Sequence, residues 1–414
     1  MGIPKEKGID HTLTMMMEGY KYIANRRNRF RSNIFETRLL GQKVICMGGE
    51  EAAEVFYDND KFKRKGAAPK RIQKSLFGEN GVQTMDGAAH KHRKAMFMSM
   101  MTPERIDDLL AIAEQQWDIA VKDWQKKGRI VLFREAEKVM CRIACQWAGV
   151  PLWAKELKQR TEDMSAMIDA FGAVGPRHWQ GRTARDRSEK WIRGIIRQVR
   201  YGERNPSKET PLYQVAWHRD LNGELLSLQM AAVELLNVVR PIVAIGRFVT
   251  FGALGLHDFP ETKEKLRSGD EKYSRMFVQE VRRYYPFGPF LGARVKNDFK
   301  WASHKFKKSR LVLLDVYGTN HDSDLWENPH EFNPERFQEW QGSPFDFLPQ
   351  GGGDYDIGHR CAGEWITVEI MKVSLEFLAN RIEYNVPKQD LNYSLVRMPS
   401  IPKSRFVMEG ITVK

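Results

Sequence analysis

Apolar side chains recur every three or four positions through most of the chain, which is the spacing of one buried face of an α-helix. This pattern predicts helices over residues 103–125, 135–148, 154–170, 183–201, 227–256 and 364–382. Short segments with strand character occur in three places, at residues 35–48, 306–318 and 394–413. The sequence therefore predicts a mainly α-helical fold with small β-sheets.

Residues 326–363 break this regularity, because they are rich in Pro, Gly and aromatic residues and show almost no periodic pattern. Irregular stretches of this length inside compact domains are usually functional. The chain has no internal repeat and no shift to a linker-like composition. We therefore expect a single domain that covers residues 1–414.

The composition is that of a globular protein, with 42% hydrophobic and 29% charged residues. A formal charge of +13 suits nucleic acid, an anionic membrane or acidic small molecules, and charge alone does not choose between them. Short basic clusters at residues 26–29 and 61–65 match no nucleic-acid-binding motif, so we interpret them as solvated surface. We expect no nucleic-acid partner and a mild attraction for anionic substrates.

The N-terminal residues contain no apolar run long enough for a signal peptide or membrane anchor, and no later run predicts a membrane-spanning helix. We expect a soluble, cytoplasmic protein. The four cysteines are too few and too unevenly spaced for a disulfide framework. Cys46, Cys141 and Cys145 are interpreted as core residues, which leaves Cys361.

Cys361 lies between Gly358 and an apolar helix that opens at Glu364, in the sequence GHRCAGE. Glycines allow the backbone to approach a flat ligand closely, and the amide groups at a helix N-terminus stabilise a thiolate. This is a suitable position for an anionic metal ligand. Taken alone, the segment is equally consistent with a glycine-rich loop that happens to contain a cysteine.

Two further motifs precede this loop. Glu280 and Arg283 are spaced i, i+3 on one helix face, and Arg336 follows in the sequence PERF. A single Glu-x-x-Arg is a weak signal, because an ordinary surface ion pair has the same form. In this order, however, the three elements resemble the signature of the cytochrome P-450 superfamily, in which a Glu, an Arg and a later Arg lock the loop that carries the haem thiolate.

The resemblance implies the cytochrome P-450 fold, with haem b held between two long helices and Cys361 as its axial ligand. A thiolate ligand favours cleavage of the O–O bond, unlike the histidine of globins. The haem carboxylates need cationic or hydrogen-bonding partners, since they are otherwise buried unpaired. The candidates for this role are His90, Lys94, Arg294, His359 and Arg360, each of which is equally consistent with surface charge.

The long helix over residues 227–256 contains the pair Arg240-Pro241 near its centre, where ordinary members of the superfamily carry an acid followed by a threonine. Proline removes a backbone hydrogen bond and bends a helix. Arg240 has no carboxylate three or four positions away, so it needs a partner from elsewhere. An acid on another helix is one possible partner. Arg247, almost two turns further along, is consistent with a face that is partly exposed to water. We favour a bound carboxylate as the partner.

The Arg-Pro pair, the insertion GGGDYDIG before the cysteine, and the segments FGAVGPRHW and YYPFGPFLGA together resemble the bacterial fatty-acid peroxygenases and decarboxylases. The resemblance implies that Arg240 and Pro241 bind a long-chain fatty acid and that the substrate carboxylate acts as general acid and base. Hydrogen peroxide would be the co-substrate, so no reductase partner is expected. A carboxylate held beside the iron leaves the α and β carbons within reach of the oxidant.

Other substrate-binding residues follow from the same resemblance. We expect Phe77, Phe171, Gly172, Val174 and Phe290 to line the channel for the alkyl chain, although any of these apolar side chains is also consistent with plain core. Gln83 occupies a position beside the haem that is glutamine in enzymes making mainly hydroxy acids and histidine in strong decarboxylases. We therefore expect hydroxylation with minor formation of terminal alkene. Ala362 departs from the family, which usually has proline after the cysteine.

Two alternatives remain open from the sequence. A reductase-dependent monooxygenase would need NAD(P)H and redox partners, and the missing acid–threonine pair argues against it. A non-catalytic protein that binds haem or lipid would take up fatty acid and leave it unchanged in the presence of peroxide.

Overall fold

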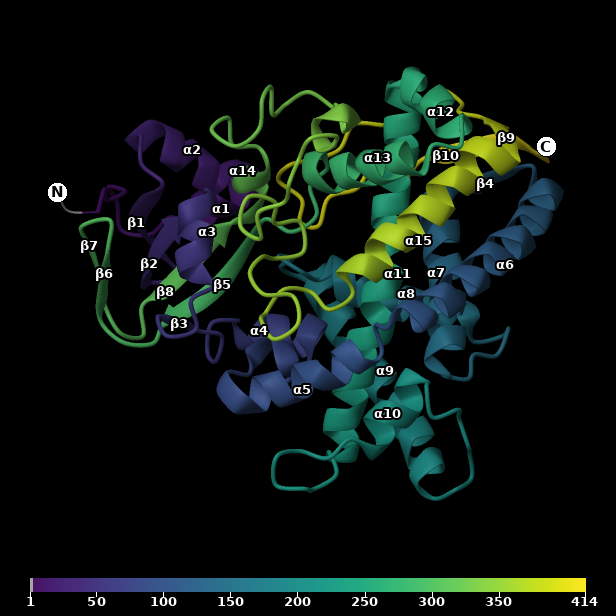
Figure 1. The fold of residues 1–414 in the computed structure, drawn as a ribbon, viewed down its shortest axis with the longest axis horizontal. Helices are drawn as coiled ribbons and strands as arrows, with labels where there is room; N and C mark the ends of the chain where they lie inside the picture. The colour runs from purple at the N-terminus through teal and green to yellow at the C-terminus, as the bar shows by residue number, and fades with distance from the viewer. Residues whose placement is uncertain (1–2) are drawn as a thin grey trace.

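The computed structural model describes residues 3–414. Helices make up most of the fold and gather on one side, while the largest sheet and the N-terminal helices lie on the other (Figure 1). The α-helices are α1 Thr12–Glu18, α2 Tyr22–Phe30, α3 Glu50–Phe56, α4 Lys70–Ile72, α5 Gly87–Ser99, α6 Pro103–Lys127, α7 Leu132–Ala148, α8 Leu157–Asp169, α9 Pro176–Arg200, α10 Pro211–Trp217, α11 Leu228–Asp258, α12 Pro260–Arg267, α13 Glu271–Tyr284, α14 Val316–Asn320 and α15 Glu364–Glu376. Short 3-10 and π-helical segments are η1 Gly19–Lys21, η2 Gln73–Phe77, η3 Val82–Thr84, η4 Pro334–Phe337 and η5 Phe377–Arg381.

The strands form three small sheets. Their bounds are β1 Ile34–Leu39, β2 Gln42–Met47, β3 Phe62–Lys63, β4 Arg129–Val131, β5 Phe290–Val295, β6 Phe299–Trp301, β7 His304–Phe306, β8 Leu311–Asp315, β9 Ile382–Asn385 and β10 Val407–Val413. The largest sheet has the order β1-β2-β8-β5-β3, in which only β2 and β8 are parallel, with Val44 opposite Leu311. The order β4-β10-β9 makes the second sheet, and β6 pairs with β7.

All six predicted helices are present, with boundaries that differ by up to seven residues; the last one ends as an α-helix at Glu376 and continues as the π-helical η5. The helix expected to begin at residue 183 begins at Pro176, because proline suits the first helical position and Gly175 supplies the positive-φ residue before it. Of the three strand segments, the first forms β1 and β2, and the second forms β8 and then enters α14. Only the end of the third forms a strand, β10, because Pro399 and Pro402 interrupt the segment before it.

The long helix α11 runs through the middle of the helical side and is crossed by α15 (Figure 1). The Ser227 hydroxyl caps its start by accepting the Met230 N–H at 3.0 Å. Nearly all of its side chains are buried among α7, α9 and α15. α11 is long and apolar enough to cross a membrane by composition, but most of it is buried inside the protein, so the core position of this helix explains its apolar character. The irregular residues 326–363 lie between α11 and the large sheet and lead into α15.

Candidate active site

Cys361 lies in the loop that leads into α15. Its backbone N–H donates to the Gln350 carbonyl at 3.1 Å, and its sulfur accepts hydrogen bonds from the Gly363 N–H and, at 3.7 Å, from Gln350 Nε2. Burial raises the pKa of the Cys361 thiol, and the Gly363 N–H and the Lys94 ammonium oppose that effect. Burial therefore has a larger effect on the pKa of this thiol than the helix terminus, which the sequence identified as a stabilising feature. The donors that would stabilise a metal-bound thiolate are nevertheless in place.

Two glycines explain how this loop reaches its position. Gly351 and Gly353 have φ of +91° and +78°, and a Cβ atom at either one would lie 3.0–3.1 Å from the Tyr57 side chain. The loop therefore wraps around Tyr57 in a way that only glycine permits. At Gly363, by contrast, an added Cβ would meet nothing within 4 Å. The backbone beside the thiol thus leaves room for a flat ligand.

Glu280, Arg283 and Arg336 meet in a buried network. Arg283 donates from Nε and Nη2 to the two Glu280 oxygens, each at 2.7 Å, and Arg336 Nε lies 3.3 Å from the same carboxylate. Arg283 also donates to the carbonyls of Asn320 and Pro329, at 2.9 and 2.8 Å. The network joins α13 to the irregular segment that precedes the cysteine loop.

A second ion-pair network holds the other side of the loop, and the sequence reasoning missed it. Arg282 is 1% exposed and donates to Glu364 at 2.6 Å and to the Gln350 side-chain oxygen at 2.9 Å. Arg360 Nε donates to the other Glu364 oxygen at 2.6 Å. Arg360 thus directs its Nε to Glu364, and its predicted role beside a haem carboxylate stays a prediction.

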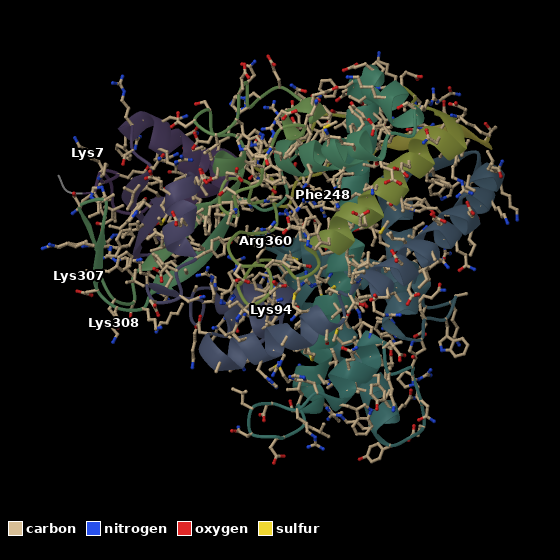
Figure 2. All side chains as sticks on the ribbon, in the orientation of Figure 1. Lys7, Lys94, Phe248, Lys307, Lys308 and Arg360 are labelled. Atoms are coloured by element: carbon tan, nitrogen blue, oxygen red, sulfur yellow. The ribbon has the colours of Figure 1, made fainter. Side chains whose placement is uncertain are left out.

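Four basic side chains gather on one side of the loop: Arg64, His90, Lys94 and His359. The rings of His90 and His359 stack at a centroid distance of 3.9 Å, and Lys94 Nζ donates to the Arg360 carbonyl at 2.5 Å. Burial, with the charges of neighbouring basic groups, lowers the pKa of His90 to about 4 and that of His359 to about 2. Figure 2 shows Lys94 and Arg360 close together at the centre of the view. This cluster has an excess of cationic groups.

Arg64 was not identified from the sequence, because its basic cluster was interpreted as solvated surface. It is only 8% exposed and lies over the Phe56 ring at 4.4 Å. Burial lowers its pKa, and Asp86, which accepts its backbone N–H at 2.7 Å, is the acidic group that opposes this. Its burial could have been anticipated only from the aromatic residues at 56, 57 and 62 around it.

Arg294 departs from the sequence prediction. Its guanidinium donates to the Gly66 carbonyl at 2.5 Å, the Ser309 carbonyl at 2.8 Å and the Gln42 side chain at 3.3 Å. These partners lie along the large sheet, where Arg294 pairs with Lys63. The side chain therefore stabilises loops at the sheet edge and is not assigned to a haem carboxylate.

Arg240 is 6% exposed on α11, and within residues 3–414 no carboxylate lies within ion-pair distance of it. Its one hydrogen bond runs from Nη2 to the Asn237 side-chain oxygen at 3.4 Å, and its Nε has no partner in the described chain. Burial lowers the pKa of Arg240 to about 9; Arg185 contributes in the same direction, and the Cys361 thiolate opposes it. The group therefore remains charged at neutral pH. Pro241, half-buried, follows without interrupting the helix.

Asn237 connects Arg240 to Gln83. Its Nδ2 donates to the Gln83 side-chain oxygen at 3.3 Å and to Glu234 at 3.1 Å. Glu234 is fully buried and accepts Arg93 Nη1 at 2.6 Å and the Val82 N–H at 3.1 Å. The sequence reasoning missed Glu234 and Asn237, although the spacing of three between residues 234, 237 and 240 places polar groups along one face of an apolar helix.

Four of the proposed channel residues lie on segments near α8 and α9. Phe77 is half-buried at the end of η2, which packs against α9. Phe171 follows α8 and is half-buried, Gly172 lies against the Met398 side chain, and Val174 is 50% exposed. Their role in lining a channel stays a prediction.

Phe290 does not belong with them. It packs against the buried cluster of Tyr22, Phe35 and Leu313, on the large sheet. Three residues earlier, Phe287 stacks on Phe248 of α11 at a centroid distance of 4.4 Å. Of the two phenylalanines in this segment, Phe287 is the one that contacts α11.

Comparisons with known proteins show the family and the fold. The family model "Cytochrome P450" matches residues 269–403. Cytochrome P450 26A1 of Danio rerio is 23% identical over 91% of this chain and 82% of its own length. Among solved structures, cytochrome P450EX alpha (CYP152N1) with myristic acid is 50% identical over 100% of this chain and 99% of that one, with a TM-score of 0.96. A variant of cytochrome P450 OleT with arachidonic acid is 39% identical over 100% of this chain and 99% of that one, with a TM-score of 0.97.

Proposed function

Because the chain belongs to the CYP152 family of cytochromes P450, we propose that it uses hydrogen peroxide to hydroxylate long-chain fatty acids, with Arg240 holding the substrate carboxylate. Oxidation takes place at the α or β carbon, and decarboxylation to a terminal alkene is a minor outcome. No reductase is required. The enzyme is soluble, and we place it in the cytoplasm.

The side chains around Cys361 fit haem b. The sulfur would ligate the iron, and two donors, Gly363 and Gln350, already face it. Arg64, His90, Lys94 and His359 supply the cationic or neutral donors that two buried haem carboxylates need. A haem held by a thiolate supplies the chemistry that cleaves the O–O bond of peroxide.

One observation carries the proposal: Arg240 is buried and charged and has no carboxylate partner within residues 3–414. A charge in this position is stable only with an anion beside it. The Cys361 thiolate opposes the lowering of the pKa of Arg240, but only weakly compared with burial. A fatty-acid carboxylate bound to Arg240 by two parallel hydrogen bonds would supply the missing charge.

The same carboxylate would perform the proton transfers. Between residues 235 and 249, α11 contains no Asp, Glu or Thr, so this helix offers no acid–threonine pair to deliver protons. A carboxylate held by Arg240 is positioned to accept a proton from hydrogen peroxide and to return it. The Asn237 amide contacts the guanidinium through its oxygen and Gln83 through its nitrogen, so Asn237 would help to orient the guanidinium toward a bound carboxylate.

The proposal is tested with Arg240→Ala. The variant should retain haem and the thiolate spectrum but lose nearly all turnover of palmitate at any peroxide concentration, because the acid–base group is no longer positioned. Arg247→Lys is the matched control, since Arg247 lies two turns along α11, donates to the Ser400 carbonyl at 3.0 Å and lies 3.7 Å from Asp169. It should keep most of its activity.

A second experiment distinguishes the loss of carboxylate binding at Arg240 from a general loss of structure. Short carboxylic acids, too small to be oxidised, should let the wild type oxidise neutral molecules by supplying the carboxylate themselves. The same acids should have no effect on Arg240→Ala. Retention of most palmitate turnover by Arg240→Ala would contradict the proposed role of this residue.

A further inference from the structure

The helix α1 lies on the surface without a single buried residue. It presents Leu13, Met16 and Met17, which are 74%, 40% and 74% exposed. Ile9 before it and Leu40 in the β1–β2 turn are 89% and 65% exposed. We call these five residues the α1 face.

The five side chains form one surface. The Leu40 N–H donates to the Thr12 hydroxyl at 2.7 Å, and the His11 N–H donates to the Arg38 carbonyl at 2.8 Å. The Gly41 N–H donates to Asp10 at 2.7 Å. These bonds attach α1 to the β1–β2 turn, so Leu40 lies beside the helix. Large apolar side chains gathered in this way indicate a contact with something outside the molecule.

Basic residues surround the α1 face. Lys5, Lys7, Lys21, Arg29 and Lys43 are exposed. The acids nearby are already engaged: Glu6 and Glu18 pair with Arg26, and Asp10 holds the turn. Lys7, Lys21 and Lys43 have no acidic partner among residues 3–414, so the surroundings of the α1 face carry excess positive charge.

Apolar side chains that project from a basic surface suit an anionic lipid bilayer better than a protein partner. Ile9, Leu13 and Met17 stand out from the surface, and a protein partner would need a matching pocket for each. A bilayer accepts projecting side chains without such pockets, and its anionic headgroups attract the surrounding lysines.

The segment that follows α1 packs against segments that contact α11. Immediately after α1, the Tyr20 N–H donates to the Leu395 carbonyl at 2.8 Å, and the Tyr20 hydroxyl donates to the Phe287 carbonyl at 2.7 Å. Phe287 stacks on Phe248 of α11, the helix that carries Arg240. Val396, next to Leu395, is 48% exposed. A bilayer in contact with α1 would therefore lie close to the elements that surround the site.

We propose that the α1 face docks the enzyme on anionic membranes, from which it takes up fatty acid. The contact is peripheral and needs no membrane-spanning segment. Docking itself rests on the surface alone, whereas fatty acid as the molecule taken up rests on the proposed function.

Co-sedimentation of the holoenzyme with vesicles tests the proposal, without peroxide. The wild type should bind vesicles of phosphatidylglycerol and phosphatidylcholine in equal parts far better than vesicles of phosphatidylcholine alone, and high salt should weaken the binding. Leu13→Ser with Met17→Ser should reduce the partition coefficient by about tenfold or more. Lys7→Gln should reduce it roughly fivefold.

Leu221→Ser is the matched control, because Leu221 is 57% exposed on the loop between α10 and α11. It should bind like the wild type, as should Arg240→Ala, so failure of docking and failure of the catalytic role are distinguishable. Equal binding by the wild type and the double variant, or no binding by the wild type to either vesicle, would overturn the proposal. The proposal would also be overturned if the wild type were a dimer and the double variant a monomer, because the α1 face would then join two copies of this chain.

Discussion

Replacing Arg240 by leucine should stabilise the ligand-free enzyme while abolishing its binding of fatty acid. The pKa of Arg240 falls from 12.5 to about 9 on burial, which at about 1.4 kcal/mol per pKa unit corresponds to an upper bound of about 5 kcal/mol for burying the charge. A leucine removes this penalty but also the hydrogen bond to Asn237. We expect a net gain of about 1–3 kcal/mol in the free energy of unfolding at pH 7.

The lowered pKa of Arg240 determines how the stability difference between the wild type and Arg240→Leu changes with pH. Below about pH 9 Arg240 is charged in both the folded and the unfolded protein, so the full penalty applies. As the pH rises above 9, the folded protein releases the proton first and the penalty shrinks. The advantage of Arg240→Leu should therefore be largest at neutral pH and decrease in alkaline solution.

Urea unfolding of the holoenzyme, followed by circular dichroism, measures the difference directly. Palmitate at one hundred times its dissociation constant should stabilise the wild type by about 2.7 kcal/mol and leave the variant unchanged. Asn237→Ala is a useful comparison, because it removes the one hydrogen bond of Arg240 and keeps the charge. If Arg240→Leu lost stability without palmitate, or gained as much from palmitate as the wild type, the reasoning about an unpaired buried charge would be refuted.

Three other predictions follow from the same site. The reduced enzyme with carbon monoxide should show the strongly red-shifted Soret band of a thiolate haem, and Cys361→Ala should lose it; a histidine-type spectrum in the wild type would exclude Cys361 as the ligand. Gln83→His should raise the share of alkene without abolishing turnover, because an imidazole can relay protons and an amide cannot; gas chromatography that finds an unchanged product ratio would remove Gln83 from the account. Palmitate affinity, measured by spectral titration, should be level between pH 7 and pH 8 and fall as the pH rises through about 9 with the charge of Arg240; an affinity that rises in that range would contradict the clamp.

Local patterns explain why much of the fold was predictable. Helical periodicity located α6, α7, α8, α11 and α15 within a few residues. The i, i+3 spacing of Glu280 and Arg283 permits an ion pair, and the order of the motifs, rather than the spacing alone, led to its prediction. The position of Cys361 before a helix was equally visible in the sequence.

Contacts between distant segments explain what was not predicted. Arg282 lies 82 positions from Glu364 along the chain, and Glu234 lies 141 positions from Arg93, so no local spacing reveals either ion pair. Arg64 was interpreted as surface charge because its neighbours are lysines, and its burial depends on how the aromatic rings fold over it. Arg294 and Arg360 were assigned by residue type alone, and the structure gives each guanidinium other partners.

Product analysis of palmitate with hydrogen peroxide, in the absence of NAD(P)H and any reductase, tests the central claim most directly. The purified holoenzyme should form 2-hydroxy- or 3-hydroxypalmitate as the main product, with pentadecene as a minor one, because the carboxylate held at Arg240 leaves only the first carbons within reach. Oxidation near the methyl end of the chain, a majority of alkene, or turnover only with a reductase and NAD(P)H would contradict the account.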